Sequence, residues 1–226
     1  VGTNFSSCND GIHSKDDLVI TGGNITVTAA NNGIKGKDYI AVADGNITVT
    51  AGNDGIKSTN DTDTGKGYVQ VNGGTVTVTS YADGIQGEQD VTINGGTLNI
   101  TTTGTGNDSA KGIKSVGLYD AAGTTLQSGG TLTVNGGMIT VNSKDDSLHS
   151  GGDIVLNAGK LKITSGDDAV HSDSTLYVGG KTAGTDYTSL EVYVTACYEG
   201  FEAETIYQNN GNIYILSSDD GYNASA

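Results

Sequence analysis

The sequence has 226 residues, a formal net charge of −15, 36 glycines and neither proline nor tryptophan. This charge argues against nucleic acid or an anionic membrane surface as a partner, because phosphate groups would be repelled. The many β-branched, Asn and Gly residues disfavour helices, and no apolar run is long enough for a transmembrane helix. The abrupt start at Val1 is typical of a mature or trimmed chain, so the missing signal peptide is no evidence for the cytosol.

A repeat of about 22 residues runs through most of the chain. Its first copies align as NDGIHSKDDLVITGGNITVTAA and NNGIKGKDYIAVADGNITVTAG, and later copies are spaced further apart by insertions. The copies begin at Asn9, Asn31, Asn53, Ala82, Ala110, Asp145, Asp167, Tyr198 and Asp219. This spacing predicts eight full structural turns and a partial ninth.

Each copy contains three short apolar segments in which apolar and polar residues alternate. In the first copy these hold Ile12, then Leu18 and Ile20, then Ile25 and Val27. Alternation is the period of a strand with one buried face, and segments bounded by Gly/Asn turns are too short for helices. Three strands per copy predict an all-β fold, a parallel β-helix, in which turns stack about 4.8 Å apart. We expect one domain over residues 1–226.

One corner of the predicted coil carries aspartates. The residue before each Gly-Ile-like pair is acidic in most copies, and Asp145-Asp146 is predicted to stack on Asp167-Asp168. Two carboxylates about 4.8 Å apart repel by about 3.5 kcal/mol at an effective dielectric constant of 20, so they need protonation, a nearby lysine or a bound cation. Ca²⁺ prefers such oxygen ligands, with opposite ligands separated by a similar distance.

We therefore expect Ca²⁺ between stacked turns, at the two ends of a column that Lys111 interrupts. The alternative is that these are turn residues on a solvated acidic face. The predicted ligands are Asp145, Asp146, Asp167 and Asp168, then Asp219 and Asp220, then Asn9, Asp10, Asn31, Asn53 and Asp54.

A further column contains the histidines. His13, His149 and His171 share it with lysine, glutamine, glutamate and asparagine. This mixed occupancy argues against a histidine metal site and predicts side chains that line the face beside the aspartates.

The DDGI/DDAVHSD-type turns, the GGxIxVT strands and the proline-poor, Asp-rich repeat resemble a family of secreted carbohydrate-binding β-helix proteins of cellulolytic bacteria. The similarity extends from Asn9 to about Tyr222, and the residues that match are the Asp pairs at Asp145, Asp167 and Asp219. The resemblance implies a right-handed parallel β-helix, similar in fold to family 9 pectate lyases. It also implies bound calcium, and binding of cellulose and of acidic sugars such as polygalacturonate. No motif fixes a sugar subsite.

Four of the 11 tyrosines are candidates for sugar contact. Tyr177 and Tyr207 are predicted to point outward from one strand column in successive turns, and Tyr193 and Tyr214 from the next sheet. A cross-strand packing ladder is the alternative interpretation.

Other functions stay open at this point. A calcium-dependent lyase needs a base that abstracts a proton; there is no arginine, and Lys35, Lys57 and Lys114 repeat like surface residues. An outward Thr-x-Thr array on three turns resembles an ice-binding face, but its column continues as Asn99, Thr140, Lys162 and Glu191. A passive cell-surface stalk or adhesin segment is a third alternative. The sequence favours a secreted, non-catalytic binding protein.

Overall fold

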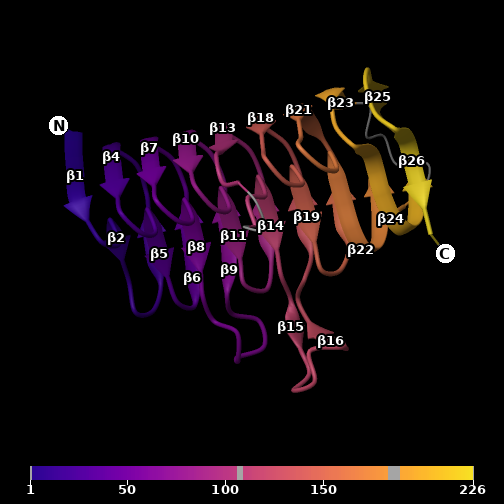
Figure 1. The fold of residues 1–226 in the computed structure, drawn as a ribbon. Coiled ribbons are helices and arrows are strands. Elements are labelled where there is room, and N and C mark those ends of the chain that lie inside the picture. The colour runs from indigo at the N-terminus through magenta and orange to yellow at the C-terminus, as the bar shows by residue number, and fades with distance from the viewer. Residues whose placement is uncertain (1, 106–108, 183–188, 226) are drawn as a thin grey trace.

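The computed structural model describes residues 2–105, 109–182 and 189–225, with no side-chain description at 5–7. Every regular element in this part of the chain is a β-strand, and there is no helix that could cross a membrane. Apart from one hairpin, all strands pair in parallel and stack from the N-terminal to the C-terminal end as a solenoid (Figure 1). The predicted all-β fold of stacked parallel strands is therefore confirmed.

One wall of the solenoid is a nine-stranded parallel sheet, called the first wall here. Each strand pairs with the corresponding strand of the next turn. Its members in spatial order are β1 (Gly2–Cys8), β4 (Asn24–Ala29), β7 (Asn46–Ala51), β10 (Thr75–Ser80), β13 (Thr97–Thr102), β18 (Met138–Asn142), β21 (Gly159–Thr164), β23 (Leu190–Ala196) and β25 (Asn212–Ile215).

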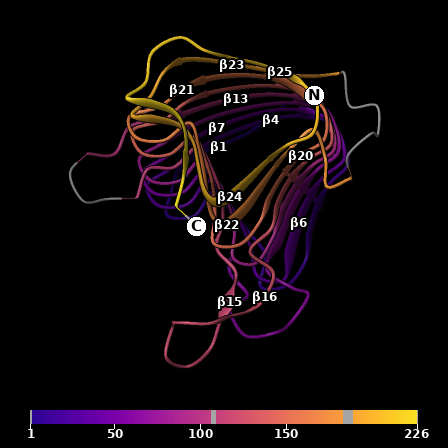
Figure 2. The same ribbon diagram turned by 90° about the vertical axis from the view of Figure 1, so that its right-hand side faces the viewer.

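Two further columns of strands complete each turn, as the view along the axis shows (Figure 2). The second wall contains β2 (Ile12–His13), β5 (Ile34–Gly36), β8 (Ile56–Ser58), β11 (Ile85–Gly87), β14 (Ile113–Ser115), β19 (Leu148–Ser150) and β26 (Asp220–Ala224). The third wall contains β3 (Leu18–Ile20), β6 (Tyr39–Val42), β9 (Tyr68–Val71), β12 (Val91–Ile93), β17 (Leu132–Val134) and β20 (Ile154–Leu156). The long strands β22 (Val170–Val178) and β24 (Glu199–Gln208) take part in both.

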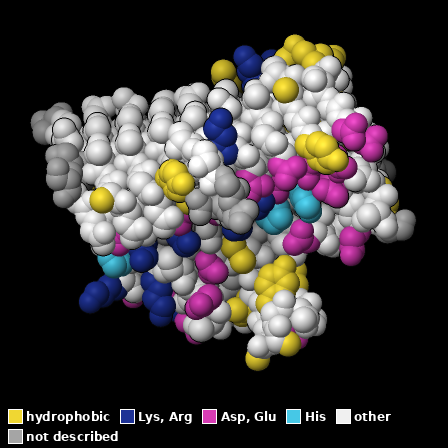
Figure 3. All heavy atoms as spheres, viewed as in Figure 1, with side chains coloured by type: hydrophobic (Ala, Val, Ile, Leu, Met, Phe, Trp, Pro, Cys, Tyr) yellow, Lys and Arg dark blue, Asp and Glu magenta, His cyan; other side chains and the backbone are white. Residues whose placement is uncertain are grey.

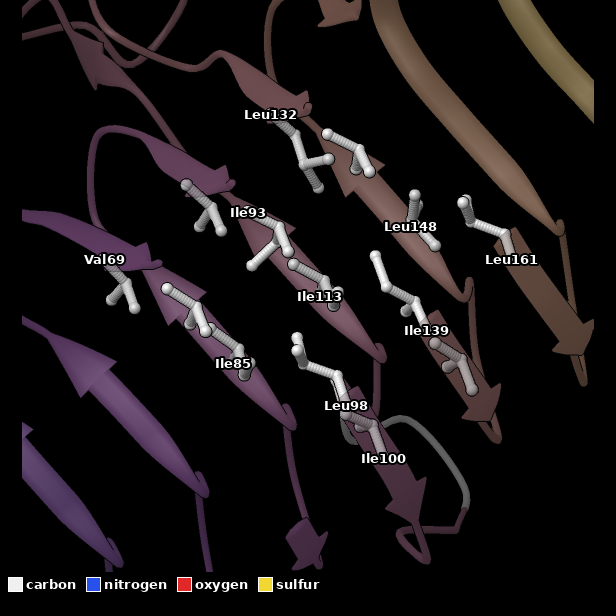
Figure 4. Close-up of a cluster of buried hydrophobic side chains, with 14 of the residues drawn as sticks. Val69, Ile85, Ile93, Leu98, Ile100, Ile113, Leu132, Ile139, Leu148 and Leu161 are labelled. Atoms are coloured by element: carbon white, nitrogen blue, oxygen red, sulfur yellow. The ribbon is translucent and has the colours of Figure 1, made fainter. Parts of the chain in front are cut away.

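The core consists of ladders of aliphatic side chains that run along the solenoid. Ile113 is fully buried and lies in register between Ile85 and Leu148. Figure 4 shows this ladder together with those of the other two walls, including Leu98 and Leu132. Because one turn alone leaves its apolar face open, each ladder depends on the turns on both sides.

A ladder of asparagines outlines one corner of the solenoid. Asn94 Nδ2 donates to Asn72 Oδ1 at 2.7 Å, Asn135 donates to Asn94 at 2.8 Å, and Asn157 donates to Asn135 at 2.7 Å. The glycines that follow tolerate the left-handed backbone needed there; Gly96, for example, has a φ of 96°. In the sequence, each of these four asparagines precedes Gly-Gly or Ala-Gly, so the ladder follows the repeat.

Two elements lie outside the predicted repeat. Strand β1 precedes the first copy at Asn9 and pairs with β4, so the first wall begins one strand earlier than expected. The insertion at residues 116–130 contains an antiparallel hairpin of β15 (Leu118–Tyr119) and β16 (Leu126–Ser128), which projects from the solenoid (Figure 1).

Candidate functional site

The aspartate column lies at the corner where the first wall turns into the second. Backbone bonds join successive turns there: Gly11 N–H donates to Asn32 O, and Ser147 N–H donates to Asp168 O. The Asp carboxylates also hold this corner together, since Asp146 Oδ1 accepts the amide hydrogen of Asp168 at 3.2 Å. The carboxylates of Asp54, Asp83, Asp146 and Asp168 are buried, whereas Asp167, Asp219 and Asp220 are exposed.

Lysines provide much of the compensation for these buried charges. Lys57 Nζ lies 2.8 Å from Asp54 Oδ2, three residues earlier in the chain. Lys114 Nζ lies 3.3 Å from Asp83 Oδ2, in the neighbouring turn. The side chains of the next column therefore do line the face beside the aspartates, as predicted, and they point back onto it.

Lys111 has a role that its place in the sequence does not reveal. Its ammonium lies 2.9 Å from Asp145 Oδ1 and 2.7 Å from Asp146 Oδ2, in the following turn. Burial opposes ionisation of Asp146, but the hydrogen bond from His149 and the charge of Lys111 hold the pKa of this carboxyl below its usual range. The residue that interrupts the acidic column thus neutralises the next turn.

The structure brings three of the predicted calcium ligands together. Carboxylate oxygens of Asp145, Asp146 and Asp167 lie within 4.8 Å of one another. Burial and the neighbouring carboxylates of Asp168, Asp146 and Asp145 raise the pKa of Asp167. The ion pairs of Lys111 are with two of these three carboxylates, those of Asp145 and Asp146.

The predicted N-terminal calcium ligands have other partners. Asp10 Oδ1 accepts hydrogen bonds from Asn31 Nδ2 at 2.9 Å and Asn32 Nδ2 at 3.0 Å, and Asn53 donates to Asn32 at 3.1 Å. At the C-terminal end, Asp220 is exposed and pairs in register with Glu199. Within the described ranges, no group of three His, Cys, Asp or Glu side chains close enough to hold one metal ion includes Asp10, Asp54, Asp219 or Asp220.

The carboxylate of Asp168 faces the second wall and not the Asp145 group. Its Oδ2 lies 3.1 Å from Nδ1 of His171, which also lies 3.2 Å from Glu202 Oε2. The hydrogen bond to Asp168, with one to Asp173, raises the pKa of His171 to about 10. The hydrogen bond between Asp168 and Glu202 raises the pKa of Glu202 to about 7. Histidine and acidic side chains gather over these C-terminal turns in Figure 3.

A third acidic group lies away from this corner and has no counterpart in the sequence analysis. It consists of Asp16 and Asp17 in the first turn and of Asp38, which the repeat of about 22 residues places beside Asp16 in the second turn. Lys66 Nζ lies 2.6 Å from Asp38 Oδ2, and Asn60 Nδ2 donates to Asp38 Oδ1 at 2.6 Å. These two hydrogen bonds lower the pKa of Asp38 to about 2, and the one from Lys66 has the larger effect.

The Asp38 interactions predict a pH dependence of stability. The pKa of Asp38 in the folded protein is lower than that of an unfolded aspartate, which is about 3.9. The ionised carboxylate therefore stabilises the fold at pH values above about 3.9, and this contribution is lost as the pH falls through about 2. The melting temperature of wild type should therefore exceed that of Asp38→Asn at neutral pH, and the difference should close in acid. Melts from pH 7 to 2 test this, with Asp61→Asn at an exposed position as control. A difference that does not change with pH would contradict this account.

The two predicted tyrosine pairs are in register, as expected. Tyr177 lies opposite Tyr207, with ring centroids 5.4 Å apart and planes at 12°, and Lys181 Nζ lies 4.9 Å from the Tyr177 ring. Tyr193 lies opposite Tyr214 on the first wall, with centroids 6.3 Å apart. Both rings of the Tyr193–Tyr214 pair are exposed.

The outward threonine column leads to Tyr193, whereas the sequence predicts Glu191 at this position of the column. The outward column of Thr26, Thr48 and Thr77 is in register as predicted. It continues through Lys162 to Tyr193 and not to Glu191, which lies opposite Lys160. The threonine column and the tyrosine pair are therefore two parts of one continuous outer face.

A shallow groove of about 250 Å³ lies on this face at the C-terminal end. Its lining combines apolar, aromatic and charged side chains, among them Met138, Thr140, Lys160, Lys162, Glu191 and Tyr193. A shallow groove on a rigid sheet suits a ligand that lies along the surface.

A rigid solenoid with long outer faces is the architecture of a repeat protein that binds an extended partner. The family model for carbohydrate-binding domain-containing proteins matches residues 4–169, and the chain belongs to this family. The match includes the aspartate column from Asp10 to Asp168 and ends before the four predicted tyrosines. Comparisons with curated proteins and with solved structures found no match.

Proposed function

We propose that the protein binds plant-cell-wall polysaccharide outside the cell without cleaving it. The ligand is cellulose or an acidic polymer such as polygalacturonate, and it lies on the first wall beside Tyr193 and Tyr214. The scaffold in this proposal is a single right-handed parallel β-helix over residues 1–226. Membership of a carbohydrate-binding family supports the general function.

The observation that carries this proposal is the in-register Lys162–Tyr193–Tyr214 column on consecutive strands. Tyrosine rings offer an apolar face and a polar tip, which suits the C–H faces and hydroxyl groups of a sugar chain. Lys162 is exposed beside them and supplies a positive charge for a uronate in a protein with a net charge of −15.

The Tyr193–Tyr214 pair is a better sugar platform than the Tyr177–Tyr207 pair. The Tyr177 ring already contacts the Tyr207 ring and the ammonium of Lys181. A stacked pair of this kind stabilises neighbouring strands without any ligand. We therefore assign Tyr193 and Tyr214 to the main subsite, and Tyr177 and Tyr207 to packing or a peripheral contact.

Calcium is the second part of the proposal. Asp145, Asp146 and Asp167 would hold the ion, because their carboxylate oxygens lie within 4.8 Å of one another and the ion pairs of Lys111 are with Asp145 and Asp146. Such oxygen donors suit Ca²⁺. The ion would neutralise the acidic corner and hold two turns together, and a carboxylate-bearing sugar could complete its coordination.

A non-catalytic role agrees with the environment of the lysines that a lyase would need. Lys57 and Lys114 form ion pairs with buried aspartates, and Lys35 lies 3.9 Å from Asp10. A lysine held against an aspartate in this way is poorly placed to abstract a proton from a sugar. The threonine face is interrupted by Asn99 and Lys162, which weakens the ice-binding alternative.

Replacement of both Tyr193 and Tyr214 by alanine is expected to weaken polysaccharide binding at least tenfold. Buried aromatic anchors contribute about 2 kcal/mol each when they lie at the centre of an interface. Binding isotherms on cellulose and on polygalacturonate measure the effect. The matched control is Tyr39→Ala with Tyr68→Ala, a stacked pair on the third wall. Equal affinities for wild type and the Tyr193/Tyr214 variant would rule out this subsite.

A further inference from the structure

The second wall holds a group of side chains that carbohydrate binding does not use. Asp168 Oδ2 and Glu202 Oε2 lie 3.1 Å and 3.2 Å from the same atom, Nδ1 of His171. His171 and Glu202 are opposite each other on the paired strands β22 and β24, and Asp168 precedes β22. Two paired strands and the preceding turn thus bring three potential ligand atoms together, one each from Asp168, His171 and Glu202.

His171 and Asp168 are each held in place by a residue outside this group of three. His171 Nε2 lies 3.2 Å from Asp173 Oδ1, and Asp168 Oδ1 accepts the amide hydrogen of Glu199 at 3.1 Å. When Nε2–H donates to Asp173, Nδ1 is left to bind a cation. A carboxylate on the far nitrogen is the usual support of a metal-ligating histidine.

The space above these atoms is accessible. Asp168, His171 and Glu202 line an open pocket of about 320 Å³, which Tyr198 and Glu199 border on the next turn. Two carboxylates and one imidazole would leave coordination positions for water or for an oxygen ligand from the pocket.

The neighbouring group of Asp146, His149 and His171 is less suitable for a metal ion. Lys111 Nζ lies 2.7 Å from Asp146 Oδ2, the oxygen that also meets His149. A cation at that oxygen would face a fixed ammonium. Lys111 also lines the pocket above the Asp168 group, but its ion pairs are with Asp145 and Asp146.

We propose that Asp168, His171 and Glu202 form a site for a divalent transition-metal ion of the Zn²⁺ type, with Asp173 orienting the histidine. The imidazole ligand favours Zn²⁺ over Ca²⁺, whose ligands are oxygens. On binding, the metal takes the place of the proton that His171 shares with the two carboxylates, and that proton is released to solvent. This site goes beyond the proposed sugar binding and does not depend on it.

Calorimetric titration of chelator-treated protein with ZnCl₂, together with melting curves, tests the site. Wild type is expected to bind Zn²⁺ and melt at a higher temperature, and excess Ca²⁺ should not displace the ion. His171→Gln should lose at least tenfold in Zn²⁺ affinity, and Asp173→Asn about 10- to 100-fold.

The matched control is His13→Gln, which should bind Zn²⁺ like wild type. His13 occupies the same column but lies 3.8 Å from Asp10. Melts in chelator identify any variant that fails to fold, and Glu202→Gln gives a second test at a half-buried position. Absence of Zn²⁺ binding by wild type, or undiminished affinity in folded His171→Gln and Glu202→Gln, would overturn the proposal.

Discussion

Replacing Lys111 with methionine is expected to destabilise the protein by about 2–3 kcal/mol when divalent cations are absent. Removing one partner of a buried ion pair costs about 3–5 kcal/mol, because the other charge stays buried without compensation. The cost is lower here because His149 still meets Asp146 at 3.0 Å. Urea denaturation in chelator measures the loss, with Lys162→Met at an exposed position as control.

Calcium should restore much of the stability that the Lys111→Met variant loses. Without the ammonium, the carboxylates of Asp145, Asp146 and Asp167 have more affinity for a cation, so this variant should respond to Ca²⁺ more strongly than wild type. A variant that is destabilised equally with and without Ca²⁺ would show that the acidic corner binds no calcium. The same protein samples therefore test both the lysine's role and the calcium proposal.

Ile113→Ala is expected to lower the free energy of unfolding by about 2–5 kcal/mol, the usual cost of truncating a fully buried aliphatic side chain. Ile113 lies in a central turn between Ile85 and Leu148, so the cavity weakens contacts with both neighbouring turns. Ile12→Ala in an end turn should cost less, because Ile12 is only partly buried.

Urea unfolding midpoints of the two isoleucine variants and of Val19→Ala measure this gradient. Val19 is 51% exposed on β3 and should tolerate the change within about 0.5 kcal/mol. Equal losses at Ile12 and Ile113 would contradict the view that stability comes from stacking between turns.

The repeat period accounts for what the sequence predicts well. A fixed spacing of about 22 residues determines which side chains stack, so the threonine column and both tyrosine pairs could be identified in advance. The error at Glu191 follows an insertion at residues 181–189, after which the period no longer gives the register. Strand β1 was missed because its sequence lacks the repeat motif.

The site was harder to predict because its partners come from different columns and turns. The sequence shows that aspartates stack, but not that Lys111 reaches forward to Asp145 and Asp146. Mixed occupancy of the histidine column argued against a metal site, yet His171 alone in that column meets both Asp168 and Glu202 within 3.2 Å. These contacts depend on how far a long side chain extends toward the neighbouring turn. The spacing of the repeat shows which residues share a column, but it does not show which side chains meet across turns.

The most direct test of the central claim is depletion of the protein from solution by insoluble cellulose and by polygalacturonate, each with Ca²⁺ and with chelator. We predict depletion by at least one polymer without release of unsaturated sugar, and Ca²⁺ should strengthen binding to polygalacturonate. Release of unsaturated sugar would instead identify a lyase. No depletion by either polymer under any condition would contradict carbohydrate binding at the first wall and favour a structural stalk.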